Sequence, residues 1–258
     1  LAAACPAGDT PSGPVTHATV QAAVDEAMAM QDPNPVIEIC SGTYREDVTI
    51  RGVGARRTLS MQTLTIMGVG PDKSAVTIDG SGIAGPVINV VAASSVNISN
   101  LTVDGQAAMV ALVPQGQVVG IRYALVNGTI SNVSVQNIRD ADGTAQGIGI
   151  LAEGQDLATF DPMNPPTGVL LQLVQVMVLN ATRVGILGDG QGVDLLVQTS
   201  MLTGPVAPLV HAPIGVQVSR GAKGHVSDSE FSNFQSPIPS TGAGSGIAFL
   251  CPAVNSGG

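Results

Sequence analysis

A six-residue pattern recurs five times in the second half of the chain and constrains its fold more than any other feature. The first, fourth and sixth positions are mostly apolar, whereas the third is polar in every copy. One copy cannot bury its apolar face alone, so the copies must stack as short strands joined by tight corners. The copies are ISNLTV (98–103), ISNVSV (130–135), LVQVMV (173–178), VQTSML (197–202) and VSDSEF (226–231).

A glycine followed by Ile or Val accompanies this repeat. Such a pair precedes each copy from the second onward, and a last pair stands near the C-terminus. The interval between copies varies because loops of different length intervene. The pairs are Gly120-Ile121, Gly147-Ile148, Gly185-Ile186, Gly215-Val216 and Gly246-Ile247.

The polar third position predicts a ladder along the stack. Strands stack about 4.8 Å apart, which lets side-chain amides or hydroxyls bond from one coil to the next. Asparagine also tolerates the left-handed backbone of a tight corner. The predicted ladder contains Asn100, Asn132, Gln175, Thr199 and Asp228.

The first half of the chain follows the same plan more loosely. Short β-type runs separated by Gly, Pro and Asp lie at 35–40, 47–50, 64–70, 76–82 and 86–91. Residues 18–30 have helical apolar spacing, with Thr16 or Thr19 as a cap, and would cover an open strand edge. We therefore expect one all-β domain over 1–258, with a helical cap region at 15–34, coils at 35–250 and a tail at 251–258.

The opening segments TVQAAVDEA, VIEIC, SGTYRED, LTIMGVG and VTIDGSG resemble the N-terminal coil of pectinesterases. The wider resemblance is to the pectin-lyase-like superfamily, and its closer part covers residues 15–82. It implies a right-handed parallel β-helix with a helical N-terminal cap, secreted or at the cell surface. It implies no activity, because many β-helix proteins share that opening.

The catalytic pattern of pectinesterases is not matched. Their acid/base segment resembles N-C-x-F-x-G-x-Q-D-T, and the comparable stretch here is NVSVQNIRDADG (132–143). Asp140 then takes the acid/base position, but Arg139 replaces the expected Gln and Arg183 stands at the nucleophile position. The chain also has no Trp for the family's later signature. An active pectinesterase is not expected, and the signatures of pectin hydrolases, mannuronan epimerases and pectate lyases are absent.

The sequence predicts no cofactor, with calcium as an open alternative. Asp140 and Asp142, beside Arg139, could bind calcium or perform acid/base work. The same residues are also typical turn formers after a strand. The stretch GDGQGVD (188–194) invites the same two interpretations.

Composition limits the partners. The formal net charge is −9 with ten basic residues, which disfavours nucleic acid. No apolar run is long enough to span a membrane. Three cysteines are widely spaced, and an oxidising compartment would favour one disulfide, for which Cys5 and Cys40 are the candidates.

Two functions remain open. The favoured hypothesis is a non-catalytic surface, adhesive or self-assembling structural subunit that contacts other protein chains, including its own copies. Low charge, apolar Pro-bearing loops and a final rung expected to lack a covering helix favour it. The alternative is a divergent polysaccharide lyase, hydrolase or epimerase that uses a groove on the solenoid, with Asp140, Arg139 and Arg122 as its candidate catalytic residues. Arg122 should point outward, opposite to Ile121.

Overall fold

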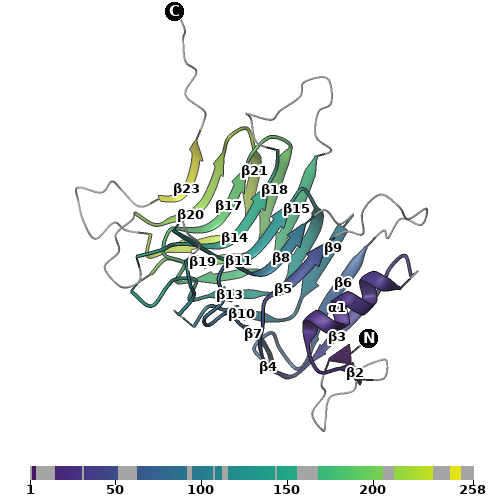
Figure 1. Ribbon diagram of the computed structural model, residues 1–258. Helices are drawn as coiled ribbons and strands as arrows, with labels where there is room; N and C mark the ends of the chain where they lie inside the picture. The colour runs from purple at the N-terminus through teal and green to yellow at the C-terminus, as the bar shows by residue number, and fades with distance from the viewer. Residues whose placement is uncertain are drawn as a thin grey trace, which may run out of the picture.

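The computed structural model describes residues 2–3, 15–30, 32–51, 63–91, 95–106, 108–111, 116–142, 144–155, 168–205, 212–234 and 245–250. Within these ranges the strands form three parallel sheets (Figure 1). Successive coils contribute one strand to each sheet in turn, and the chain winds as a right-handed parallel β-helix. The predicted fold class is confirmed.

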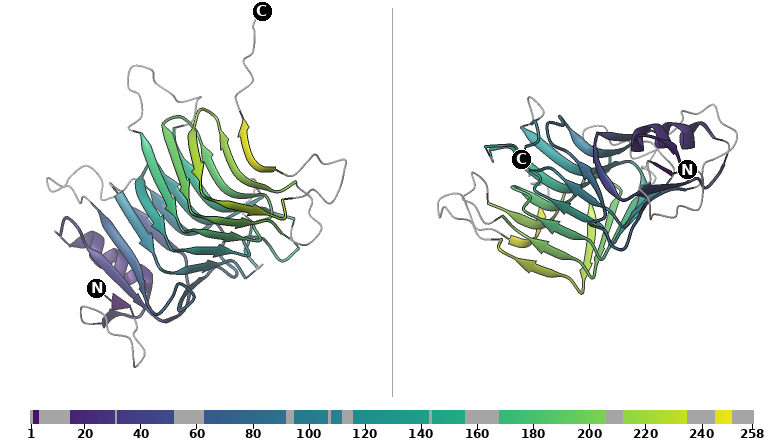
Figure 2. Two further views of the ribbon diagram at one scale, coloured as in Figure 1. Left: turned by 180° about the vertical axis from the view of Figure 1, so that it is seen from behind. Right: turned by 90° about the horizontal axis from the view of Figure 1, so that it is seen from below.

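The three sheets are named A, B and C in the order in which the chain visits them. Figure 2 shows their strands stacked from the helix at one end to β23 at the other. Sheet A contains β2 (Val15–His17), β1 (Ala2–Ala3), β3 (Val36–Cys40), β6 (Leu64–Val69), β9 (Ser95–Ser99), β12 (Asn127–Ser131), β15 (Val169–Val174), β18 (Val193–Gln198) and β21 (Lys223–Ser227). Sheet B contains β4 (Gly42–Arg45), β7 (Val76–Asp79), β10 (Thr102–Asp104), β13 (Ser134–Gln136), β16 (Met177–Leu179), β19 (Met201–Thr203) and β22 (Glu230–Ser232). Sheet C contains β5 (Val48–Arg51), β8 (Pro86–Val91), β11 (Gln117–Ala124), β14 (Gln146–Glu153), β17 (Val184–Asp189), β20 (Ile214–Ser219) and β23 (Ser245–Leu250).

The five repeat segments lie in the register that their alignment predicts. Their first positions form one inward-facing column of sheet A, and their sixth positions form one of sheet B. Aliphatic side chains thus stack on their equivalents, which explains a core built with few aromatic residues. The sheet A column is Ile98, Ile130, Leu173, Val197 and Val226, and the sheet B column is Val103, Val135, Val178, Leu202 and Phe231.

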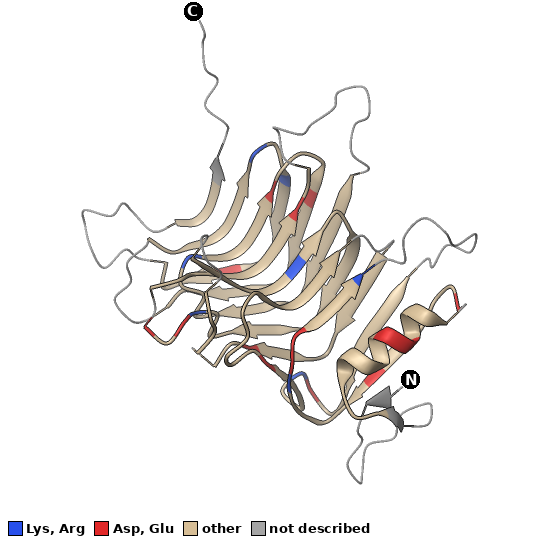
Figure 3. Cartoon of the chain, viewed as in Figure 1, with Lys and Arg blue, Asp and Glu red and all other residues tan. Residues whose placement is uncertain are grey.

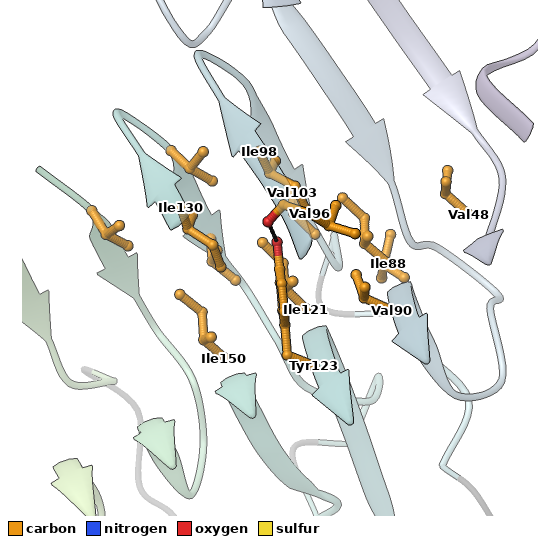
Figure 4. Close-up of a cluster of buried hydrophobic side chains, with 14 of the residues drawn as sticks. Val48, Ile88, Val90, Val96, Ile98, Val103, Ile121, Tyr123, Ile130 and Ile150 are labelled. Atoms are coloured by element: carbon orange, nitrogen blue, oxygen red, sulfur yellow. Dashed lines mark hydrogen bonds between the residues drawn. The ribbon is translucent and has the colours of Figure 1, made fainter. Parts of the chain in front are cut away.

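Sheets C and A fit together by complementary side-chain size. Tyr123 is fully buried in β11, and the facing position in the next strand is Gly128. A Cβ at Gly128 would lie 2.7 Å from Cε1 of Tyr123 and 2.1 Å from the carbonyl oxygen of Val96. The Tyr123 hydroxyl donates to that carbonyl over 2.9 Å (Figure 4). Gly128 therefore makes room for the largest side chain in the core.

A glycine column runs through the middle of sheet C, with one correction to the sequence alignment. The column is Gly120, Gly149, Gly185, Gly215 and Gly246, because strand register pairs Ile121 with Ile150. The equivalent pair in the fourth coil is thus Gly149-Ile150, and the prediction of Gly147-Ile148 was wrong. A Cβ on any of the first four would lie 2.4–2.7 Å from the carbonyl oxygen of the next glycine. Close approach of successive coils therefore requires glycine there.

The described residues contain one helix, α1 (Val20–Ala29), which covers the N-terminal coil. Thr19 is its N-cap, and its side chain accepts from the amide of Ala22. The amides of Val20 and Gln21 both donate to the carboxylate of Glu46 over 2.9 Å. Glu46 belongs to the SGTYRED segment, so this segment holds the helix cap in place.

Candidate functional site

The outer face of sheet C carries the first of two ion pairs that join neighbouring coils. Arg122 lies outside the core in β11 while Ile121 is buried, as strand alternation predicts. The Arg122 Nε donates to Oε2 of Glu153 over 2.6 Å, and Nη2 lies 2.5 Å from the same oxygen. The Arg122 Nη1 also donates to Oδ1 of Asn89 over 3.2 Å. One guanidinium therefore links three successive coils, β8, β11 and β14.

The second ion pair lies one coil further along. Asp189 is the register partner of Glu153 in sheet C and is bound by Arg220, whose Nε donates to Oδ1 over 2.6 Å. A second contact joins Nη2 of Arg220 to Oδ2 of Asp189. The hydroxyl of Ser219 also donates to Oδ1 of Asp189 over 2.9 Å. Two carboxylates thus stand on adjacent coils, each neutralised by its own arginine.

An apolar column lies beside these pairs on the same face. Leu151 is 5% exposed and packs with Val119 and Ile148 in a cluster separate from the main core. Leu187 joins that cluster, and Gln217 follows it in register. The Gln217 Oε1 is buried and has no hydrogen-bond partner among the described residues. Charged residues are sparse on the strands as a whole (Figure 3), and sheet C brings Arg122, Glu153 and Asp189 onto one face, so its polar groups form the main candidate site.

The sequence-predicted catalytic residues are not brought together as one group. Asp140 follows β13, where its Oδ1 accepts from the amide of Ala145 and its Oδ2 accepts from the hydroxyl of Thr144. These bonds close a turn between sheets B and C. The Arg139 Nε is buried and has no hydrogen-bond partner in the described residues. No hydrogen bond or ion pair in those ranges links Asp140, Arg139 and Arg122.

The predicted polar ladder occupies the corner between sheets A and B. Every member has a left-handed backbone, with φ between 49° and 55°. The Asn100 Nδ2 donates to the carbonyl of Gly68 over 2.8 Å, and the Asn132 Nδ2 donates to Oδ1 of Asn100 over 3.0 Å. No such side-chain bond continues through Gln175, Thr199 and Asp228 in the described part of the chain. All five coils have this left-handed corner, whereas side-chain amide bonds along it join Gly68, Asn100 and Asn132.

A second ladder, at the corner between sheets B and C, was missed by the sequence analysis. The carboxylate of Asp104 accepts from Nε2 of Gln136 over 2.7 Å, from Nδ2 of Asn137 over 3.0 Å and from the amide of Gln106 over 2.8 Å. The Asn180 Nδ2 then donates to Oδ1 of Asn137 over 2.9 Å. Asp104 is 6% exposed, so these donors stabilise a nearly buried charge.

The signal for this second ladder was present in the sequence. Its corner position follows each first-ladder residue by five, giving Gly105, Asn137, Asn180, Gly204 and Asn233. Asn137, Asn180 and Asn233 have a left-handed backbone, with φ between 55° and 61°, which asparagine tolerates better than most residues. Both ladders hold neighbouring coils together.

No cluster of three or more His, Cys, Asp or Glu side chains that could hold a metal occurs within the described ranges. Asp189, in the GDGQGVD stretch, is bound by Arg220, and Asp194 lies exposed in β18. No described helix is long and apolar enough to cross a membrane.

Cys40 is fully buried at the end of β3 and forms a disulfide. Its predicted partner, Cys5, lies outside the described residues. Strand β1 pairs with β3, placing Ala3 beside Ile39. Ala3 lies two residues before Cys5, and Ile39 lies one residue before Cys40. The register of β1 and β3 therefore favours the Cys5–Cys40 pairing, which stays a prediction.

The fold defines the class: a parallel β-helix protein with a capped N-terminal coil. Among solved structures, the crystal structure of Escherichia coli YbhC is similar, with a TM-score of 0.56 and 15% sequence identity. The similarity covers 96% of this chain and 71% of that one, and it shows a shared fold. No protein-family model matches the chain. No curated protein sequence matches it either.

Proposed function

We propose that this chain is a non-catalytic extracellular β-helix protein of the pectin-lyase-like type, acting as a surface, adhesive or self-assembling structural subunit. The observation that carries the proposal is the state of three candidate carboxylates. Glu153 and Asp189 are each bound by an arginine, and the carboxylate of Asp140 closes a turn. A nucleophile or general base must be free to reach its substrate. These carboxylates instead stabilise contacts between neighbouring coils and a turn.

A secreted or cell-surface location belongs to the same proposal. The disulfide of Cys40 supports it, because disulfides persist in oxidising compartments. The proposed partners are other protein chains, including copies of this one, with polysaccharide as a further candidate. No cofactor is proposed, and calcium remains the alternative to test with a chelator.

A turnover assay tests the absence of catalysis. The wild-type chain is incubated with a panel of acidic and neutral polysaccharides, which are compared before and after by proton NMR. We expect unchanged spectra for the wild type and for Asp140→Ala. New unsaturated, reducing or inverted sugar signals from the wild type would overturn the proposal.

The second candidate function is a divergent polysaccharide-active enzyme. It is favoured by one observation: Asn89, Arg122, Glu153 and Asp189 share one face of sheet C with the unpartnered Gln217 Oε1. A ligand carboxylate could take Arg122 from Glu153. For this function, Arg122→Ala should abolish turnover, whereas Asp194→Ala, an exposed carboxylate of sheet A, should leave it unchanged.

A further inference from the structure

Five Asn-x-Ser/Thr sequences occur in the chain, beginning at Asn97, Asn100, Asn127, Asn132 and Asn180. In a secreted protein this tripeptide is the acceptor for an asparagine-linked glycan, whose first sugar is bonded to Nδ2. A folded chain can carry such a glycan where Nδ2 has no other partner and the surface around it is open. The five asparagines differ in both respects.

Three of these asparagines lie in the two corner ladders. The Nδ2 atoms of Asn100, Asn132 and Asn180 each donate to an acceptor on the preceding coil, over 2.8–3.0 Å. The third residue of each tripeptide is also buried, with at most 5% of its surface exposed. A glycan on these corners would displace bonds that hold neighbouring coils together. The buried third residues are Thr102, Ser134 and Thr182.

Asn127 lies outside both ladders, at the start of β12, where the chain passes from sheet C to sheet A. Its side chain is exposed. Its Oδ1 accepts from the amide of Leu170 over 2.7 Å. Because a backbone amide can only donate, this bond fixes which branch of the side chain is the oxygen and leaves Nδ2 on the other branch. Nδ2 makes no hydrogen bond within the described ranges.

The surface around Asn127 is apolar and open. Leu125, two residues earlier in the chain, is 55% exposed, and Leu170, beside Asn127 on β15, is 39% exposed. Thr129, the third residue of the tripeptide, is half-buried, unlike its buried equivalents in the ladders. A sugar on Nδ2 would shield both leucines from water.

Asn97 is the nearest alternative, and its surroundings are more crowded. It is half-buried in the middle of β9, with Thr65 and Thr129 beside it on the two neighbouring strands. Its Oδ1 accepts from the amide of Thr129 over 3.1 Å. Strands in a sheet are about 4.8 Å apart, so a glycan on Asn97 would have to displace these neighbours.

We propose that Asn127 is the attachment site of an N-linked glycan and that the other four tripeptides carry none. Nδ2 forms a bond to the anomeric carbon of a lipid-linked oligosaccharyl diphosphate, and the bond from that carbon to the diphosphate oxygen breaks. The lipid diphosphate leaves, and Nδ2 loses one proton to solvent. Oδ1 is unchanged, so the bond from Leu170 is kept. The inference rests on the extracellular location within the proposed function.

Expression of the full chain through the secretory pathway of a eukaryotic host cell tests this site. Enzymatic glycan release in oxygen-18 water converts each glycosylated asparagine to a labelled aspartate, which peptide mapping then locates. We expect label at Asn127 alone, in chain recovered from the cells and from the medium. Asn127→Gln and Thr129→Ala should each remove the glycan. Thr129→Ser keeps the hydroxyl and should keep the glycan, as should the matched control Asn97→Gln.

The pattern of label decides the question. The proposal is overturned if the wild type carries no glycan, or if any of the other four asparagines is labelled. Thr129→Ala leaves the Asn127 side chain in place, so it decides the question if Asn127→Gln does not fold by circular dichroism. A chain glycosylated at Asn127 but retained in the cells would contradict the proposed location and leave the site assignment intact. Turnover of polysaccharide would contradict the non-catalytic function without changing the labelled position.

Discussion

Replacing Tyr123 by Phe should lower the free energy of unfolding at neutral pH. It should also remove the part of the wild-type loss of stability at high pH that comes from Tyr123. The phenol is fully buried and donates to the carbonyl of Val96. Removing this bond leaves a buried carbonyl without that partner, so we expect a cost of about 1.5 kcal/mol at pH 7. Burial also raises the pKa of Tyr123 well above its usual range.

The sign of the pH effect follows from proton linkage. Above pH ~10 the unfolded chain releases the Tyr123 proton while the folded chain retains it, so wild-type stability falls by about 1.4 kcal/mol per pH unit. The Phe variant lacks this contribution, and the two stabilities should converge near pH ~11. Urea unfolding between pH 7 and 11 measures both. A stability gap that stays constant or widens above pH ~10 would refute the reasoning.

Further predictions concern the glycine column, the second ladder and the disulfide. Gly149→Ala places a Cβ 2.5 Å from the next coil's carbonyl oxygen and should cost about 3 kcal/mol in urea unfolding. Gly168→Ala, where the nearest atom is 3.6 Å away, should change stability by less than about 0.5 kcal/mol. Asn137→Ala removes a donor to a nearly buried carboxylate, so the same assay should show a loss of about 1–2 kcal/mol. Peptide mapping without reductant should recover Cys40 linked to Cys5; a Cys40 link to the C-terminal peptide would contradict that pairing.

The fold could be predicted because its signal is local and repeated. Each strand-and-corner segment carries its own apolar spacing and a residue suited to a left-handed corner, such as Asn100 or Asn132. Because five copies share one alignment frame, stacking is the arrangement that buries all of their apolar faces. The helix was equally local, since Thr19 and the apolar positions of α1 lie within one short segment.

The ion pairs on sheet C could not be predicted in the same way, because each joins residues about one coil apart. Their register was nevertheless accessible through the glycine column. Counting from Gly149 and Gly185 places Glu153 and Asp189 at the same position of adjacent strands. Assigning Gly147 to the column shifted the fourth coil by two residues and hid this match. Gly147 is required for another reason: a Cβ there would lie 1.8 Å from the carbonyl oxygen of Ile138.

Asp140 illustrates a different kind of prediction, one made from a single matched position. Its placement came from a motif alignment in which neighbouring family residues were already missing. The structure uses its carboxylate to bind the amide of Ala145 and the hydroxyl of Thr144. Asp near the end of a strand is a frequent turn former, so a single matched carboxylate carries little information about chemistry.

The most direct test of the central claim is a stoichiometric incubation of wild-type chain with acidic polysaccharide, followed by proton NMR until slow turnover would be visible. The account predicts polymer signals identical to those of the protein-free sample, because the sheet C carboxylates are engaged by arginines. Product signals that appear with the wild type and vanish with Arg122→Ala would contradict it and establish catalysis on sheet C.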